Sequence, residues 1–339
     1  MIQSDVKAIV VGAGPAGIAV VAKLLGRGES NIVWIDTDWK GGYLGTVPEV
    51  PSNTNVSLFI KYAEFVGLTP QDSPALHLLM QQPQDKGCKL KYAHAMLLDC
   101  LSLLKPQVEC ITGTVVNVIK ENRWIVTLND GINTSAQSVF LCQGARHKRL
   151  PGMDSSHPLE LILNGQIPKG PTKAAVIGSS HSGMLAAMNL VESGRVNECH
   201  IYYRSAPELT YAQVLNGDVI INDNIGLKGV VADWCQEHFG PSLKSCQIRD
   251  VRIYCYPYPG QLEAFDLVVS AIGFERNPIS LNNSVNIQRG KELWGELDAD
   301  GLYGFGIAFP ECMDGTTAVG LWKFVKTVNK VLHKIMLLS

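Results

Sequence analysis

The chain opens with Ala8-Ile9-Val10-Val11-Gly12-Ala13-Gly14-Pro15-Ala16-Gly17, a β-branched run that ends in a glycine-rich turn. A helical pattern follows over 15–25, and a second apolar run ends at Asp36. Strand, glycine turn, helix and strand in this order make up the dinucleotide-binding unit. The first glycine permits the tight turn, the second lets the backbone approach a pyrophosphate, and the third lets the helix pack on the sheet. The stretch therefore predicts a parallel α/β sheet that binds a dinucleotide.

A second turn of this kind, Gly178-Ser179-Ser180-His181-Ser182-Gly183, stands about half a chain later, after the apolar run 174–177. A helical pattern over 182–192 and a strand pattern over 200–203 complete the second unit. Two such turns in one modest chain predict two dinucleotides that face each other. This is the minimum arrangement for moving a hydride from a nicotinamide to a flavin.

Composition narrows the class of protein further. The 339 residues carry a formal net charge of −2, which predicts no broad basic surface and no nucleic-acid partner. Nine dispersed cysteines without a Cys-x-x-Cys pair indicate reduced thiols rather than disulfides or a metal site. No basic-then-apolar leader opens the chain, and glycines and Lys23 interrupt the apolar stretch 8–25. We expect a cytoplasmic protein without a membrane span, and the sequence leaves a homodimer open.

The residues after the first turn favour FAD as its ligand. Asp36 ends the second strand, where a carboxylate accepts both ribose hydroxyls. The loop Lys40-Gly41-Gly42-Tyr43 follows, and here the chain resembles the two-dinucleotide-binding-domain flavoproteins, which place a Gly-Gly loop against FAD. The segments 141–145 and 270–274 resemble the Ala-Thr-Gly strand ends of that superfamily.

The expected FAD site also includes a residue at the start of a predicted final helix. We expect a long helix over 316–337, and in the superfamily the N-terminus of such a helix points at the flavin pyrimidine edge. The residues assigned to FAD are Gly12, Ala13, Gly14, Pro15, Ala16, Gly17, Asp36, Gly41, Gly42, Tyr43, Asn53, Val115, Gln143, Gly144, Gly306 and Thr317.

The second turn differs from the first in ways that favour NADPH. Ser180 replaces the middle glycine, and its hydroxyl can donate to a phosphate. Arg204 follows the second strand where the first unit has Asp36, and a guanidinium can bind a 2′-phosphate with a charge-assisted fork. Alternatively, Arg204 is a solvated loop arginine, and His181 either lines the phosphates or projects into solvent. The residues assigned to NADPH are Gly178, Ser179, Ser180, Ser182, Gly183, Arg204, Ser205 and Gly273.

From these assignments we predict an α/β fold with two Rossmann-like dinucleotide-binding domains, the NADPH domain inserted into the FAD domain. The FAD-binding domain is expected at residues 1–160 plus 285–339, and the NADPH-binding domain at 161–284. A linker with four prolines and three glycines is expected over 149–171.

Two features argue against a disulfide reductase of this superfamily. The cysteines nearest in sequence, Cys246 and Cys255, are not closely spaced, and the usual Gly-Asp is missing from 303–308. The remaining features are similar to class B flavin monooxygenases, including the N-hydroxylating ones. They are the G-x-S-x-S-G turn, the pair Arg204-Ser205, and Ser52-Asn53-Thr54-Asn55 followed by Tyr62-Ala63-Glu64-Phe65.

The resemblance implies that Asn55 is the catalytic residue, with Asn53 close behind it. In the family, this amide lies beside the flavin. An amide at that position can donate to a peroxy group on C4a and hold bound NADP⁺. The leading hypothesis is an FAD- and NADPH-dependent monooxygenase that uses O₂ to oxygenate a small nucleophilic substrate through a flavin C4a-hydroperoxide. The alternatives are an NAD(P)H-dependent flavin reductase or oxidase without oxygen transfer, and a non-catalytic FAD-binding regulatory protein.

Overall fold

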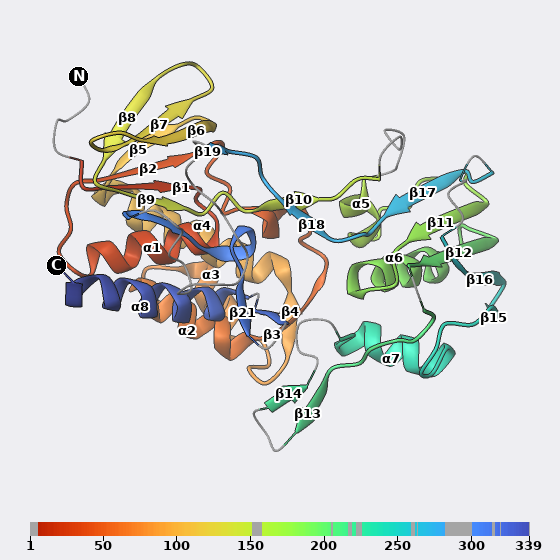
Figure 1. Ribbon diagram of the computed structural model, residues 1–339. Helices are drawn as coiled ribbons and strands as arrows, with labels where there is room; N and C mark the ends of the chain where they lie inside the picture. Colours follow the sequence, from red (N-terminus) through yellow and green to blue (C-terminus); the bar gives the residue numbers. More distant parts are fainter. Residues whose placement is uncertain are drawn as a thin grey trace. The chain divides into compact units, whose positions relative to one another are not determined.

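The computed structural model describes residues 6–150, 158–204, 206–215, 219–221, 226–258, 262, 264–281, 300–313, 316–318 and 320–338. The chain divides into two compact units. Unit 1 comprises Met1–Pro48, Thr54–Arg146 and Arg276–Ser339, and unit 2 comprises Glu49–Asn53 and His147–Glu275. Strands β10 (Ala145–His147) and β18 (Phe274–Arg276) carry the chain from one unit to the other and back, and they pair with each other. Figure 1 shows the elements of each unit.

Unit 1 contains the sheet that the opening sequence predicts. Five parallel strands lie in the order β20-β9-β1-β2-β5. Their bounds are Ala8–Val11 (β1), Ile32–Asp36 (β2), Glu109–Thr112 (β5), Ser138–Leu141 (β9) and Leu302–Gly304 (β20). Helix α1 (Pro15–Leu25) connects β1 to β2 with the predicted bounds, because Pro15 at the first helical turn suits the fixed φ of proline.

Strand alternation in unit 1 divides its core into two layers. Val10 and Trp34 point toward the helices, whereas Ile9 and Val33 point toward a second, four-stranded sheet of order β19-β6-β7-β8. Figure 1 shows the helices on one face of the parallel sheet and β6 to β8 on the other. The remaining helices are α2 (Val56–Val66), α3 (Pro74–Met80), α4 (Leu90–Leu104) and α8 (Leu321–Leu338), with the short turns η1 (Tyr43–Thr46), η2 (Lys105–Gln107) and η3 (Gly306–Ala308). The remaining strands are β3 (Pro51–Asn55), β4 (Gly87–Lys89), β6 (Val115–Lys120), β7 (Trp124–Leu128), β8 (Asn133–Ala136), β19 (Ser280–Leu281), β21 (Glu311–Met313) and β22 (Thr316–Ala318).

Unit 2 repeats the same architecture around the second turn. Its sheet has the order β15-β16-β12-β11-β17, parallel except for the antiparallel edge strand β15. The predicted α/β class with Rossmann-like parallel sheets is therefore confirmed. The bounds are Lys173–Ile177 (β11), Glu198–Tyr203 (β12), Gln213–Leu215 (β13), Val219–Ile221 (β14), Cys246–Ile248 (β15), Val251–Pro257 (β16), Leu267–Ser270 (β17), Leu159–Leu163 (α5), His181–Glu192 (α6) and Gly229–His238 (α7).

The first glycine of each turn lies against the end of a neighbouring strand. Gly12 has φ +101° and Gly178 has φ +114°, backbone angles that residues with a Cβ rarely adopt. A Cβ on Gly12 would stand 2.3 Å from the Cys142 carbonyl oxygen, and one on Gly178 would stand 2.3 Å from that of Ala271. Both turns therefore require glycine here for the same two reasons, backbone conformation and space.

The third glycine of each turn lies against the first. A Cβ on Gly17 would stand 1.9 Å from the Gly12 carbonyl oxygen, and one on Gly183 would stand 2.0 Å from that of Gly178. These contacts let the helix approach the sheet closely and direct its first N–H groups to the carboxyl ends of the strands.

The prediction for the final helix is wrong at its start. Helix α8 begins at Leu321, and Thr316–Ala318 forms β22, in which Thr317 pairs with Cys312 of β21. β-branched threonines favour extended backbone, and Gly320 at φ +132° separates this strand from the helix. Thr317 is therefore not at a helix N-terminus, and the helix-dipole argument for it does not apply.

The contact between the third and first glycines predicts the stability of two variants. Gly17→Ala should lower the free energy of unfolding by about 1–3 kcal/mol, because the methyl group meets a backbone carbonyl that cannot rotate away. Gly14→Ala is the matched control, since its Cβ would meet only Gly42 Cα at 3.6 Å. Urea unfolding of both variants measures the difference, and equal stabilities would contradict the role of this contact.

Candidate functional site

The carboxylate of Asp36 is bound to the first turn. The Ala13 N–H donates to Asp36 Oδ2 at 2.7 Å. The N–H groups of Asp38 and Trp39 donate to Oδ1 at 3.0 and 2.7 Å. These bonds hold the acid at the carboxyl end of β2, beside the glycines. A carboxylate accepts about four hydrogen bonds, so Asp36 retains capacity for a ribose hydroxyl.

The Gly-Gly loop lies against the second glycine of this turn. A Cβ on Gly42 would stand 3.0 Å from Gly14 Cα, and Gly41 and Gly42 have φ +70° and +80°. His94 Nε2 of α4 lies 2.8 Å from the Lys40 carbonyl oxygen, and this contact ties the loop to α4. Tyr43 begins η1 directly afterwards. The structure thus brings Gly42 against Gly14, with Gly41 and Tyr43 adjacent to Gly42 in the chain.

A buried acceptor without a partner lies beside the same turn. Gln143 follows β9, its backbone nitrogen would lie 3.2 Å from a Cβ on Gly12, and its Oε1 has no hydrogen-bond partner among the described residues. Asn277 holds this strand end, since Nδ2 donates to the Gln143 carbonyl at 2.7 Å and its N–H donates to that of Gly144 at 3.2 Å. An unsatisfied buried acceptor is costly, so a donor on a bound ligand fits here.

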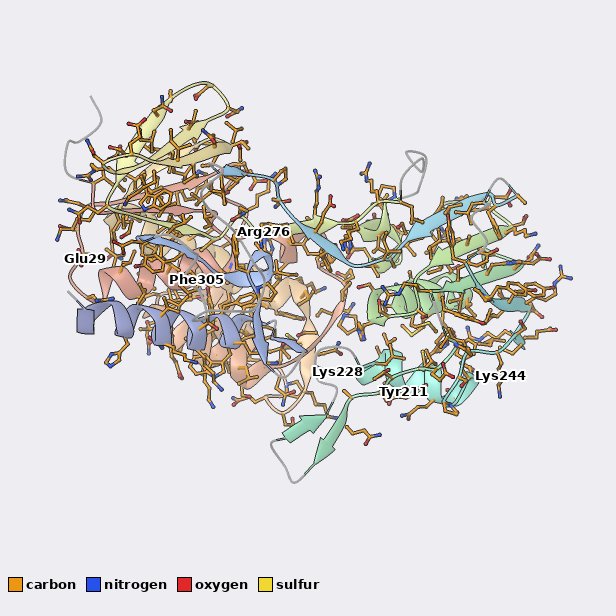
Figure 2. All side chains as sticks on the ribbon, in the orientation of Figure 1. Glu29, Tyr211, Lys228, Lys244, Arg276 and Phe305 are labelled. Carbon is orange, nitrogen blue, oxygen red and sulfur yellow. The ribbon has the colours of Figure 1, made fainter. Side chains whose placement is uncertain are left out.

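Gly306 also approaches the first turn from β20. A Cβ on Gly306 would stand 2.8 Å from Ala16 Cβ, and the preceding Phe305, labelled in Figure 2, donates its N–H to the Leu141 carbonyl at 2.9 Å. Glycine turn, acid, Gly-Gly loop, orphaned amide and close backbone approach together fit an adenine dinucleotide. Val115, in contrast, is buried at the start of β6 between the two sheets.

Helix α2 is bonded to the first turn through a residue to which sequence reasoning gave no role. The buried Tyr62 hydroxyl donates to the Pro15 carbonyl oxygen at 2.6 Å, and burial holds the pKa of this phenol well above its ordinary value. Asn55 occupies the N-cap position of α2, is exposed, and makes no capping hydrogen bond. Its side-chain amide is therefore not used by the helix that it precedes.

The second turn repeats the backbone geometry of the first. Ser180 has φ −83° and ψ −178°, and Gly14 has φ −79° and ψ −174°. The Ser180 side chain makes no capping bond with α6, so this helix does not use its hydroxyl. Ser179 and Ser182 are half-buried on either side.

The residues beyond the second turn lie at the carboxyl ends of β12 and β17. Arg204 directly follows β12 and is exposed, and Gly273 follows β17 at φ +97°. Gly273 accepts the Lys148 N–H at 2.9 Å. Ser205 lies outside the described residues.

His181 contacts a residue that sequence reasoning assigned to FAD. Its Nε2 lies 3.0 Å from Asn53 Nδ2, within unit 2. Burial, followed by the charge of Lys228, lowers the pKa of His181 to about 4. Lys228, labelled in Figure 2, is the N-cap of α7. His181 therefore does not project freely into solvent, and no sequence pattern indicated its partner.

The described cysteines are poorly suited to thiol exchange. Burial is the largest cause that raises the pKa of each of the eight cysteines described, to about 12 for Cys100, Cys199, Cys235 and Cys255. Thiol exchange requires a thiolate, so a relay between these groups is disfavoured. No group of three or more His, Cys, Asp or Glu that could hold a metal ion occurs among the described residues.

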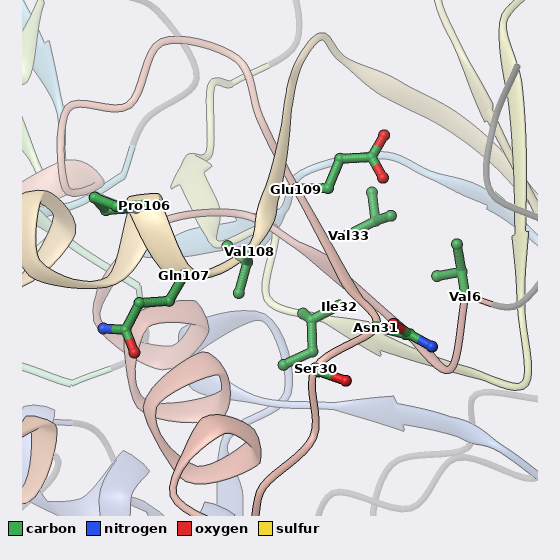
Figure 3. A pocket seen from close by; sticks show the side chains of 9 residues that line it. All are labelled: Val6, Ser30, Asn31, Ile32, Val33, Pro106, Gln107, Val108 and Glu109. Atoms are coloured by element: carbon green, nitrogen blue, oxygen red, sulfur yellow. The ribbon is translucent and has the colours of Figure 1, made fainter.

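A pocket of about 240 Å³ lies at the amino ends of strands in the parallel sheet of unit 1 (Figure 3). Its lining includes Val6 before β1, Ile32 at the start of β2 and Glu109 at the start of β5. In open α/β sheets ligands bind at the carboxyl ends of strands, so this pocket is separate from the dinucleotide turn. Within the described part of the chain, no helix has both the length and the apolar character needed to cross a membrane.

The fold and the paired turns define an α/β protein with two Rossmann-like parallel sheets, and the comparisons identify its family. Monooxygenase AgnR1 from Paecilomyces divaricatus is 33% identical over 383 residues, covering 96% of each chain. The chain belongs to the flavin-dependent monooxygenases, a flavoprotein family, which implies FAD. No protein-family model matches the chain.

Solved structures agree on the fold. A flavin-containing monooxygenase from Stenotrophomonas maltophilia superposes with a TM-score of 0.64 at 14% identity, covering 98% of this chain and 99% of that one. Lactococcus lactis thioredoxin reductase gives 0.62 at 13% identity over 97% of each chain.

The surroundings of His181 predict its titration. Its imidazole should stay neutral down to about pH 4, and Lys228→Gln should raise its pKa by removing a nearby positive charge. Because the folded state holds His181 neutral, its contribution to stability is lost as the pH falls from 6.5 toward 4. NMR titration of the histidine ring protons measures the shift. Lys244→Gln, which removes an exposed charge elsewhere in unit 2, is the control, and a His181 midpoint near 6.5 in the unaltered protein would contradict the prediction.

Proposed function

We propose that this flavin-dependent oxidoreductase is an NADPH-dependent monooxygenase that oxygenates a small nucleophilic substrate such as an amine or sulfide. The observation that carries the proposal is the pair of turns with matching backbone geometry, in a chain 33% identical to a monooxygenase along its length. One turn suits FAD and the other a nicotinamide donor. The overall reaction converts NADPH, H⁺, O₂ and the substrate into NADP⁺, H₂O and the oxygenated substrate.

The first turn supplies the residues that would hold FAD. The N–H groups at the start of α1 would bind the pyrophosphate, Asp36 would accept from the ribose hydroxyls, and the backbone of Gly41 and Gly42 would lie against the cofactor. When bound there, FAD would supply the redox chemistry, taking up a hydride from the nicotinamide and reacting with O₂. The Gln143 amide is available to a donor on the cofactor, since its Oε1 is buried without a partner among the described residues.

Asn55 is the residue that we assign to the oxygenation step. Its amide is not used in capping α2, so it can donate a hydrogen bond at the reacting oxygen and hold NADP⁺. The helix that carries it is tied to the FAD turn by Tyr62. Exclusion of water matters as well, because an unshielded oxygen adduct loses hydrogen peroxide.

The exposure of Asn55 favours a second candidate, a flavin reductase or oxidase that passes electrons to O₂ or another acceptor without oxygenating a substrate. In that case reduced flavin would return directly to its oxidised form. A non-catalytic FAD-binding regulatory protein would not be reduced by either nicotinamide. The cytoplasmic location and a homodimer stay predictions.

Rapid-mixing spectroscopy of the flavin separates these functions. The purified protein, reduced with NADPH and mixed with O₂, should show a transient absorption species before the oxidised spectrum returns. Asn55→Ala should shorten the life of this species about 3- to 10-fold, the size expected for one lost hydrogen bond. Direct return to the oxidised spectrum supports the reductase or oxidase, and absence of reduction by NADPH or NADH supports the regulatory protein.

Arg204 should decide the preference between the two nicotinamide donors. Arg204→Ala should weaken NADPH about tenfold or more and leave NADH nearly unchanged, because only NADPH carries the 2′-phosphate. The measurement is the concentration of each donor that half-saturates the rate of flavin reduction. Arg252→Ala is the matched control, since Arg252 pairs with Glu198 at the opposite end of β12. Equal losses for NADPH and NADH would refute the phosphate role.

A further inference from the structure

A short segment of the chain leaves unit 1 and belongs with unit 2. Glu49–Asn53 clusters with unit 2, although the residues before and after it, Pro48 and Thr54, belong to unit 1. Glu49 N–H donates to Asn164 Oδ1 at 3.2 Å, and Asn53 lies 3.0 Å from His181. The segment is therefore fixed at both of its ends to elements of unit 2.

The hydrogen bond at Asn53 has a defined direction. Asn53 contributes its Nδ2, which can only donate, so His181 Nε2 accepts and the ring proton resides on Nδ1. Nδ1 is buried and has no partner among the described residues. Burial and the neighbouring Lys228 cation keep the ring neutral, as the acceptor role requires.

The other side of the Asn53 amide lies at the start of α7. A Cβ on Gly229 would stand 3.2 Å from Asn53 Oδ1. Asn53 thus lies between the first turn of α6, where His181 is the first residue, and the residue after the N-cap Lys228. Its side chain is positioned by the elements that surround the second glycine turn.

Asn53 is two residues from Asn55, the proposed catalytic amide. Both belong to the extended strand β3, and α2 begins at Val56. Two extended residues span about 7 Å, so Asn53 and the start of α2 are close together along the chain. Unit 1 also holds this start, since the Val56 N–H donates to the Lys86 carbonyl at 2.9 Å. The N–H groups at the start of α6, beside His181, are those that a nicotinamide dinucleotide pyrophosphate would bind.

We propose that the Asn53–His181 hydrogen bond, here called the Asn53–His181 link, positions Asn55 in response to the nucleotide bound at the second turn. His181 and Asn53 are positioning residues that act through the start of α2. The inference rests on the proposed function, because it assumes a nicotinamide dinucleotide at the second turn and a role for Asn55.

Two substitutions of His181 test the link in the full chain loaded with FAD. The Gln amide oxygen reaches the position of Nε2 and can accept from Asn53, whereas Asn reaches only the position of Nδ1. His181→Gln should therefore preserve the link and His181→Asn should break it, with similar polarity. Asn53→Ala removes the donor. Urea unfolding of each variant confirms that the comparison is made between folded proteins.

The first measurement is hydrogen exchange with and without saturating NADP⁺, which requires no oxygen chemistry. NADP⁺ should slow exchange of the amides at 54–59 in the unaltered protein and in His181→Gln. In His181→Asn and in Asn53→Ala this slowing of exchange should be lost. The double variant that carries both substitutions should lose no more of the slowing than either single variant. Equal slowing in all the variants, or no slowing in the unaltered protein, would overturn the link.

The second measurement is the decay of the transient flavin spectrum after O₂ is added at saturating NADP⁺. Decay should be about 3- to 10-fold faster in His181→Asn and within about twofold of the unaltered protein in His181→Gln. Identical decay in these two variants would overturn the link while leaving the proposed function intact. If no transient forms in any protein, the monooxygenase function fails, and the exchange result still decides the link.

Discussion

The contact between the third and first glycines of each nucleotide turn is the constraint on which the structure depends. The gap that would receive a Cβ on Gly17 or Gly183 is already occupied by a carbonyl oxygen, at 1.9 and 2.0 Å. Because glycine has no Cβ, the helix can pack closely on its sheet and direct its first N–H groups beyond the strand ends.

The two turns share a backbone but differ in the chemistry around it. In unit 1 the turn is bonded to a carboxylate, Asp36, and faces a glycine loop, so it offers a close approach and hydroxyl acceptors. In unit 2 the middle residue is Ser180, and Arg204 follows the second strand, so the turn offers donors and a positive charge. One fold thus provides two sites of opposite character, as a flavoprotein that also binds a phosphorylated nicotinamide donor would need.

The segment 49–53 is the part of the chain through which the proposed positioning of Asn55 would act. It directly precedes Thr54 and Asn55 in the chain, and hydrogen bonds at Glu49 and Asn53 hold it within unit 2. A neutral histidine is suited to this position, because its nitrogen can accept from an amide at any pH above about 4.

The sequence by itself determined the features that depend on local backbone chemistry. Both glycine turns, the bounds of α1 and the α/β class follow from glycine, proline and apolar runs, whose conformational limits act over a few residues. The prediction from sequence was wrong at Thr316–Ala318, where local preference did not decide between strand and helix. This segment pairs with a neighbouring strand instead of starting a helix.

Only the tertiary structure decided which distant residues meet. The Asn53–His181 link and the bond from Tyr62 to Pro15 join segments far apart in the chain. The Gln143 Oε1 is buried without a partner among the described residues. Such contacts form between single polar groups on distant elements, and a single polar pair leaves no periodic signal in the sequence. The sequence therefore specifies where the cofactor turns lie, and the folded chain specifies which side chains surround them.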